Sequence, residues 1–144
     1  MQPNMSSQST PNETKFESPH ATVWLDGGIM YCRFAADLHV SLDVARSVVE
    51  RRIFFSQGKH YPLLIDMRGI KSSTGAARKY LATMGATLVT AGALITASGI
   101  NKTIGNLFLK VDQPPVPTRL FTNEEKAKIW LRQYLQETHV AGFR

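Results

Sequence analysis

The chain has 144 residues, of which 43% are hydrophobic and 19% are charged, a composition typical of one globular domain with its own core. Its formal net charge is +6, but no basic run is longer than two residues, so the sequence predicts no nucleic-acid partner. No apolar run approaches the roughly 18 residues of a membrane span, and no signal peptide is visible. A single cysteine, Cys32, excludes an intramolecular disulfide, and together these features predict a cytoplasmic protein without a membrane span.

The ends of the chain differ in composition from its middle. Residues 1–19 are rich in Ser, Asn, Gln, Thr and Pro, and such a segment buries too little apolar surface to offset the entropy lost on ordering. We therefore expect a flexible tail at 1–19, a folded domain at 20–137, and a short C-terminal tail at 138–144.

Two alternating segments at the start of the predicted domain indicate a β-hairpin. Residues 21–25 and 29–34 alternate apolar and polar side chains around an Asp-Gly-Gly turn. On the second strand one face carries Met30, Cys32 and Phe34, and we predict that this face points inward. Cys32 is then a packed small hydrophobic residue and not a nucleophile.

The middle of the chain predicts a helix followed by a buried strand. Ser41 is a suitable N-cap for an amphipathic helix over 42–55, where apolar residues recur at helical spacing. A short apolar run at 63–65 is typical of a buried strand. Asp66 and Arg68 follow at its end, and we predict an ion pair between them within the loop.

Three hydroxyl residues, Ser72, Ser73 and Thr74, precede a helix that we expect to start near Gly75 and to end near residue 85. Residues of this kind cap helix N-termini by accepting hydrogen bonds from the first backbone N–H groups. The simplest interpretation is that all three serve as caps.

A phosphate at the same place has a physical rationale. On Ser72 or Ser73 it would lie beside the N–H groups and the positive dipole end of the helix. Lys71 and Arg78 could then add charge pairing. Capping and phosphorylation are compatible, and the sequence leaves both open.

The last third of the chain continues the alternation of strands and helices. We predict a buried strand at 92–97, a helix capped by Ser98, and a short strand at 118–121. Thr122 and Glu125 then form a capping box for a final helix, which we expect to run to about residue 137. The core-facing side of the helix after Ser98 is predicted to carry Ile100, Ile104, Leu107 and Phe108.

These elements define the fold class. The predicted order is β-β-α-β-α-β-α-β-α, which implies a single α/β domain with a mixed sheet of four to five strands and about four helices. Beyond the first hairpin the sheet should be largely parallel.

Three segments resemble the SpoIIAA-like group that includes the STAS domains, and within it a set of uncharacterised bacterial members. They are Tyr-Pro-Leu-Leu-Ile-Asp-Met-Arg-Gly-Ile at 61–70, Ile-Gly-Asn-Leu-Phe-Leu at 104–109, and Pro-Thr-Arg-Leu-Phe-Thr-Asn-Glu-Glu-Lys-Ala-Lys-Ile-Trp-Leu at 117–131. The resemblance spans roughly residues 20–136 and supports the fold more than any activity.

The resemblance also implies a candidate site. In anti-anti-sigma members of the group, a strand leads through an Asp-Ser-Ser-Gly-like loop into a helix, and a partner kinase phosphorylates a serine there. The matching place here reads Lys71-Ser72-Ser73-Thr74-Gly75, with lysine at the aspartate position and a threonine before the glycine. By this resemblance Ser72 and Ser73 are candidate phosphorylation sites, and the candidate phosphorylation or partner-binding segment comprises Ser72, Ser73, Thr74 and Gly75. The charged residues expected to support it are Asp66, Arg68, Lys71 and Arg78.

No catalytic constellation is readable in the sequence. The four histidines show no metal-ligand spacing, and no Gly-rich phosphate loop occurs. We therefore expect no enzyme activity, no metal and no cofactor.

Two functional hypotheses remain. The first is a non-enzymatic regulatory or protein-interaction module of STAS-like type, with an unidentified protein partner and a possible serine-phosphorylation switch. Its contacts would centre on the helix start at 72–75 and on the neighbouring helix at 100–108. The alternative is a small-molecule or lipid-binding module that uses an apolar groove between 88 and 104, where charges are few and small residues are frequent. A homodimer is compatible with a small domain that has exposed helix faces.

Overall fold

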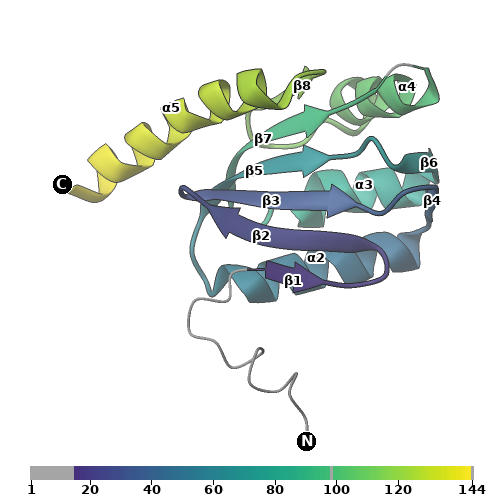
Figure 1. The fold of residues 1–144 in the computed structure, drawn as a ribbon, viewed down its shortest axis with the longest axis horizontal. Helices are drawn as coiled ribbons and strands as arrows, with labels where there is room; N and C mark the ends of the chain where they lie inside the picture. The colour runs from purple at the N-terminus through teal and green to yellow at the C-terminus, as the bar shows by residue number, and fades with distance from the viewer. Residues whose placement is uncertain (1–14, 98, 144) are drawn as a thin grey trace, which may run out of the picture.

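The computed structural model describes residues 15–97 and 99–143 as an α/β fold with six strands in one mixed sheet. The sheet order is β1–β2–β3–β5–β7–β8, in which the first three strands are antiparallel and the last four run parallel (Figure 1). The strands are β1 (Lys15–Glu17), β2 (Ala21–Asp26), β3 (Ile29–Phe34), β5 (Tyr61–Asp66), β7 (Val89–Ile95) and β8 (Thr118–Phe121).

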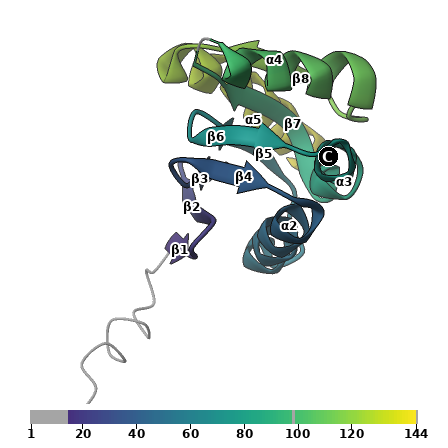
Figure 2. The same cartoon turned by 90° about the vertical axis from the view of Figure 1, so that its right-hand side faces the viewer.

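Two short strands form a separate parallel ribbon. β4 (Leu38–Val40) pairs with β6 (Ile70–Ser73), and each follows a strand of the main sheet, β3 and β5 respectively. Figure 2 faces this end of the molecule and shows β4 and β6 side by side in front of the main sheet. The ribbon places the segment after β5 beside the segment after β3.

The positions of the helices follow from the handedness of the connections. The parallel strands are added in one direction, from β3 to β8, so right-handed crossovers put the intervening helices on one face. The last helix makes no crossover and packs on the opposite face, against β3, β5, β7 and β8. The helices are α2 (Leu42–Ser56), α3 (Gly75–Thr83), α4 (Ile100–Leu107) and α5 (Glu124–Phe143), with a 3-10 turn at Met84–Ala86 and a π-helical turn at Phe108–Asp112.

Because both faces of the sheet are covered, the domain has two cores. Met30, Cys32 and Phe34 belong to the core beneath α2, α3 and α4, as the predicted alternation requires. Ile29 and Tyr31, on the other face of β3, belong to the core beneath α5. Both faces of β3 are therefore largely buried, which an alternating pattern alone does not indicate.

Cys32 is confirmed as a packed residue. Its side chain is buried in the first core, and burial raises the pKa of the thiol to about 12. At neutral pH it is a neutral thiol and a poor nucleophile, because the thiolate is the reactive form.

The fold class is confirmed, but the structure contains three short strands that the sequence analysis does not predict. β1, β4 and β6 have only three or four residues each. β1 lies within the predicted tail at 1–19 and pairs with β2, so the ordered part begins before residue 20. Residues 1–14 of that tail lie outside the described residues. At the other end α5 runs to Phe143, so the predicted tail at 138–144 is helical through that residue.

The predicted caps are right in part. Ser41 caps α2, where its hydroxyl accepts a hydrogen bond from the Val44 amide at 3.3 Å. α5 begins one residue later than the predicted capping box, because Asn123, and not Thr122, accepts from the Lys126 amide at 3.0 Å. Ser98 lies outside the described residues.

The predicted core-facing side of α4 is only partly correct. Ile104 is buried and Phe108 is partly buried, but Ile100 is 61% exposed and Leu107 lies at the surface. The buried residues of α4 are Asn101, Ile104 and Gly105. At Gly105 a Cβ would lie 2.8 Å from the side chain of Leu120. The close approach of α4 to β8 therefore depends on a glycine, and the buried face carries Ile104 while Ile100 and Leu107 lie outside it.

Candidate functional site

The predicted serine segment spans the end of β6 and the start of α3. Ser72 and Ser73 are β6 residues, so the prediction that they cap the helix is wrong. Thr74 is the N-cap of α3, and its hydroxyl accepts a hydrogen bond from the Ala77 amide at 3.0 Å. Pairing of β6 with β4 extends the strand up to Thr74, which leaves one hydroxyl residue for the cap.

The side chain of Ser72 is more accessible than that of Ser73. Its side chain is exposed, and its Oγ lies 2.6 Å from Nδ1 of His39 on β4. Ser73 is half-buried, and its hydroxyl donates to the carbonyl of Thr74 at 3.4 Å. A modifying enzyme or a partner would therefore reach Ser72 more readily than Ser73.

The two basic residues near this segment differ in how they are engaged. Lys71 is exposed and lies 3.5 Å from Asp37, a weak surface pair. Arg78 donates through Nε to Asp112 at 2.9 Å, and both side chains are largely buried. A Cβ at Gly75 would lie 3.7 Å from Arg78 Nη2, so this guanidinium group lies close to the start of α3 while its charge is paired.

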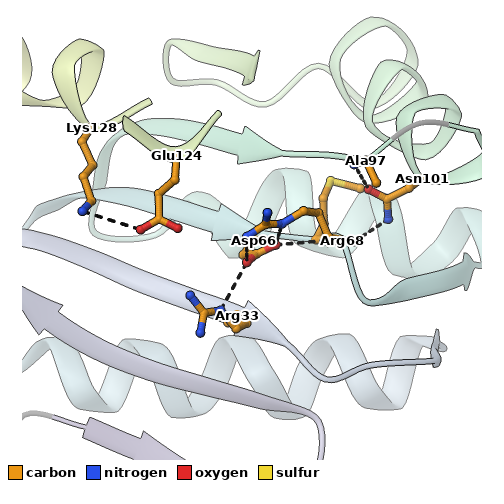
Figure 3. A network of polar contacts seen from close by, with 8 residues as sticks. Arg33, Asp66, Arg68, Ala97, Asn101, Glu124 and Lys128 are labelled. Atoms are coloured by element: carbon orange, nitrogen blue, oxygen red, sulfur yellow. Dashed lines mark hydrogen bonds and ion pairs between the residues drawn. The ribbon is translucent and has the colours of Figure 1, made fainter. Parts of the chain in front are cut away.

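The predicted ion pair of Asp66 and Arg68 is present and has a third member. Asp66 Oδ1 accepts from the backbone N and the Nε of Arg68 at 3.1 and 2.9 Å, and Oδ2 accepts from Arg68 Nη2 at 2.7 Å. Arg33, from the neighbouring strand β3, donates to Oδ2 at 3.2 Å. Figure 3 shows the carboxylate between the two guanidinium groups, near the ion pair of Glu124 and Lys128 on α5.

The environment of Asp66 keeps it ionised. Burial by itself raises the pKa of this carboxyl group, but hydrogen bonds from Arg68 and the charges of Arg68 and Arg33 outweigh burial and lower the pKa below its usual value. Both carboxylate oxygens accept hydrogen bonds from guanidinium or backbone amide donors, so the carboxylate acts as an anchor for the strand end and is a weak base.

We predict that Asp66→Asn lowers the free energy of unfolding at pH 7 by about 1–3 kcal/mol, because two arginines lose their buried counter-charge. Since the folded-state pKa is depressed, this stabilisation is present above the unfolded-state pKa of about 3.9 and is lost as pH falls through the lower folded-state value. Urea denaturation at pH 7, 4 and 3 should therefore show the two proteins converging in acid. A difference that stays constant over this range would contradict the assignment.

The predicted site residues thus fall into two places. Asp66 accepts hydrogen bonds from Arg68 and from Arg33 at the end of β3. Ser72 instead contacts β4, and Thr74 contacts the first turn of α3. No hydrogen bond or ion pair joins the two groups within the described part of the chain, so we treat Asp66 and Arg68 as structural support and the start of α3 as the candidate interaction site.

Asn101 is a structural anchor that the sequence analysis does not identify. It is 4% exposed, and its Nδ2 donates to the carbonyls of Met67 and of Ile70, the latter at 3.1 Å. Its Oδ1 accepts from the Ala97 amide at 2.9 Å (Figure 3). One side chain therefore joins α4, the end of β7 and the turn between β5 and β6, and no local pattern marks an asparagine in that role.

Two hollows differ in size and character. An apolar cavity of about 60 Å³ lies between the sheet and helices α2, α3 and α4. A larger open groove of about 750 Å³ is lined by residues of α2 and of β1, β2 and β5, with Phe16, Phe54 and Phe55 among them. The predicted apolar groove between 88 and 104 is represented only in part, by Leu94 and Ile104 in the wall of the small cavity.

The described residues contain no group of three or more His, Cys, Asp and Glu side chains placed to hold a metal ion. Within the same residues no helix is both long and apolar enough to cross a membrane.

The fold is similar to that of a solved structure. It is an uncharacterized protein of the DUF3478 family with a SpoIIAA-like fold from Shewanella loihica PV-4. The two chains share 11% sequence identity, the match covers 81% of this chain and 98% of that chain, and the TM-score is 0.55. At this identity the likeness concerns the fold alone, and it confirms the SpoIIAA-like architecture expected from the sequence.

Sequence comparisons place the chain in a family without assigning an activity. No curated protein gives a significant match. A family model described as a domain of unknown function, DUF7793, matches residues 23–135, which is most of the folded part. The chain therefore belongs to the DUF7793 family.

Proposed function

We propose that this protein is a non-enzymatic regulatory module that acts in the cytoplasm by binding another protein through the surface at the end of β6 and the start of α3. Ser72 lies at the centre of this surface, and its phosphorylation changes the affinity for the partner. The observation that carries the proposal is the exposed Ser72 hydroxyl, which lies 2.6 Å from His39 Nδ1 and two residues before Thr74, the N-cap of α3.

The local charges support a switch at Ser72. The first turn of α3 contains no acidic residue, so its free N–H groups and dipole are not compensated by a side-chain carboxylate. Lys71 is exposed beside the serine, and His39 already contacts its hydroxyl. A phosphate adds about −1.5 to −2 charge and three acceptor oxygens at this place, which is enough to alter both the surface potential and the hydrogen bonding that a partner meets.

We predict that Ser72→Asp changes the recovery of a specific partner by about tenfold, the effect of roughly 1.4 kcal/mol in binding free energy. Because the side chain is exposed, the variant should keep its stability within about 0.5 kcal/mol. The measurement is affinity purification of the tagged variants from the protein's own cells, with quantitative mass spectrometry of the bound proteins.

Ser41→Asp provides the matched control. Ser41 is also exposed and also lies at a helix N-terminus, and aspartate is an equally good N-cap there. This variant should recover the same partners as the wild-type protein. If Ser72→Asp and Ser41→Asp both behave like the wild-type protein, the switch at Ser72 does not exist.

Small-molecule binding is the second candidate function, and the apolar cavity beneath α2, α3 and α4 favours it. Its volume of about 60 Å³ is well below the roughly 300–1,000 Å³ of sites that enclose drug-sized ligands. The cavity therefore suits a small ligand and not a lipid chain.

A further inference from the structure

Two arginines line the apolar cavity, and one of them, Arg52, has no carboxylate partner among the described residues. The cavity walls come from the sheet and from all three helices on that face, and they include Arg52 of α2 and Arg78 of α3 but no carboxylate. Arg78 is neutralised by Asp112 at 2.9 Å. Arg52 is 3% exposed and forms no ion pair with any described carboxylate.

The hydrogen bonds of Arg52 satisfy only part of its guanidinium group. Nη2 donates to the carbonyls of Gly85 and Thr87, both at 2.9 Å. A guanidinium group has five N–H donors, so three remain, one on Nε and two on Nη1. These three donors have no acceptor among the described residues. The Arg52 nitrogens are nevertheless not among the fully buried side-chain polar atoms that lack a partner, since within the described residues only Thr90 Oγ1 is of that kind. The free Arg52 donors therefore keep some accessible surface.

The balance of charge at this place is unfavourable without a counter-ion. Two neutral carbonyls solvate one side of the guanidinium group, but a buried charge normally requires a partner of opposite sign. Burial also lowers the pKa of Arg52. A small anion in the cavity would supply the missing charge and accept from the free donors.

We propose that the cavity binds a short-chain carboxylate, with its carboxylate group against Nε or Nη1 of Arg52 and its apolar end among the aliphatic walls. The cavity volume of about 60 Å³ is less than half of the roughly 150 Å³ that accommodates benzene in an engineered cavity, so the ligand has only a few carbon atoms. This site goes beyond the interaction role and does not depend on phosphorylation of Ser72.

The test uses sodium propionate as the probe and the full-length protein with 13C-labelled methionine methyl groups. Met67 lines the cavity, whereas Met84 is 49% exposed and lies outside it. At constant ionic strength, propionate should shift the Met67 methyl signal in a saturable manner and leave the Met84 signal in place. Propionamide has nearly the same shape as propionate but no charge. Its affinity should be lower than that of propionate by at least about tenfold, because hydrogen bonds between charged groups are stronger than those to neutral groups.

Variants separate a ligand site from a structural arginine. Arg52→Gln should abolish the Met67 shift, whereas Arg51→Gln, which removes the exposed neighbouring charge on α2, should preserve it. If Arg52→Gln does not fold, Cys32→Leu tests whether propionate occupies the cavity, because it enlarges a side chain in the cavity wall and leaves Arg52 in place. That variant should remain folded and lose propionate binding.

Three results would overturn the proposal. The first is a Met67 signal that does not respond to propionate in the wild-type protein. The second is an equal response to propionate and propionamide, and the third is unchanged binding in a folded Cys32→Leu variant. None of these results bears on partner binding through Ser72, so the two proposals can fail separately.

Discussion

Gly69→Ala should lower the free energy of unfolding by about 3 kcal/mol or more, and it can prevent folding altogether. A Cβ at residue 69 would lie 2.3 Å from the carbonyl oxygen of Ala35 and 2.8 Å from its carbonyl carbon. These are backbone atoms of the segment between β3 and β4, which cannot rotate away as a side chain can. Gly69 also accepts through its carbonyl from the Leu38 amide at 3.0 Å, so the two segments are held together at the point of closest approach.

Gly75→Ala is the matched control for this prediction. A Cβ at Gly75 would meet only Arg78 Nη2, at 3.7 Å, which is an ordinary contact. Because alanine is the better helix former, this substitution in the first turn of α3 should be neutral or stabilise by up to about 1 kcal/mol. Urea denaturation of both variants is the measurement. Equal stability of Gly69→Ala and the wild-type protein would contradict the close contact between the β5–β6 turn and Ala35.

Asn101→Ala should lower the free energy of unfolding by about 2–4 kcal/mol. The substitution leaves the carbonyls of Met67 and Ile70 and the amide of Ala97 without their side-chain partner, and each buried unsatisfied group costs about 1–3 kcal/mol, partly recovered where water can enter. The same change should loosen the turn between β5 and β6, which precedes the proposed interaction site.

Asn106→Ala, on the same helix, controls for the loss of an asparagine. Asn106 is half-buried and forms no side-chain hydrogen bond to another described residue, so its replacement should change stability by less than about 0.5 kcal/mol. Hydrogen exchange provides a second readout, because Asn101→Ala should speed the exchange of the amides of Ala97 and Ile70. Equal effects of the two alanine variants on stability would show that Asn101 is not an anchor.

The elements predicted correctly share a strong local signal. The hairpin of β2 and β3 follows from alternation around an Asp-Gly turn, and α2 follows from its cap and its apolar spacing. Each of these patterns repeats over two or more turns or strand pairs, so one tertiary contact does not overturn it. The single-domain α/β class follows from their order along the chain.

The elements that were not predicted depend on contacts between distant segments. β4 and β6 have three and four residues, and each is a strand only because the other lies beside it. The same pairing removes Ser72 and Ser73 from the helix cap and leaves that role to Thr74. A sequence pattern identifies hydroxyl residues suited to a cap, but it does not locate the strand end that selects one of them.

The candidate site was predicted as a segment, and its chemistry was not. The ion pair of Asp66 with Arg68 follows from their spacing, whereas the contribution of Arg33 requires the parallel register of β3 and β5. Arg52 occupies a core-facing position of an amphipathic helix in the sequence. Its lack of a carboxylate partner becomes evident only when all walls of the cavity are known.

The central claim is that Ser72 is a phosphorylation switch for protein binding. The most direct measurement is phosphopeptide mapping of Ser72 and Ser73 in the protein isolated from its own cells, together with quantification of the proteins bound to wild-type and Ser72→Asp forms. The account predicts phosphate on Ser72 and a partner whose recovery changes in Ser72→Asp but not in Ser41→Asp. Unmodified Ser72 together with identical partner recovery in all three forms would contradict it, and would leave the exposed hydroxyl as a surface contact of His39 alone.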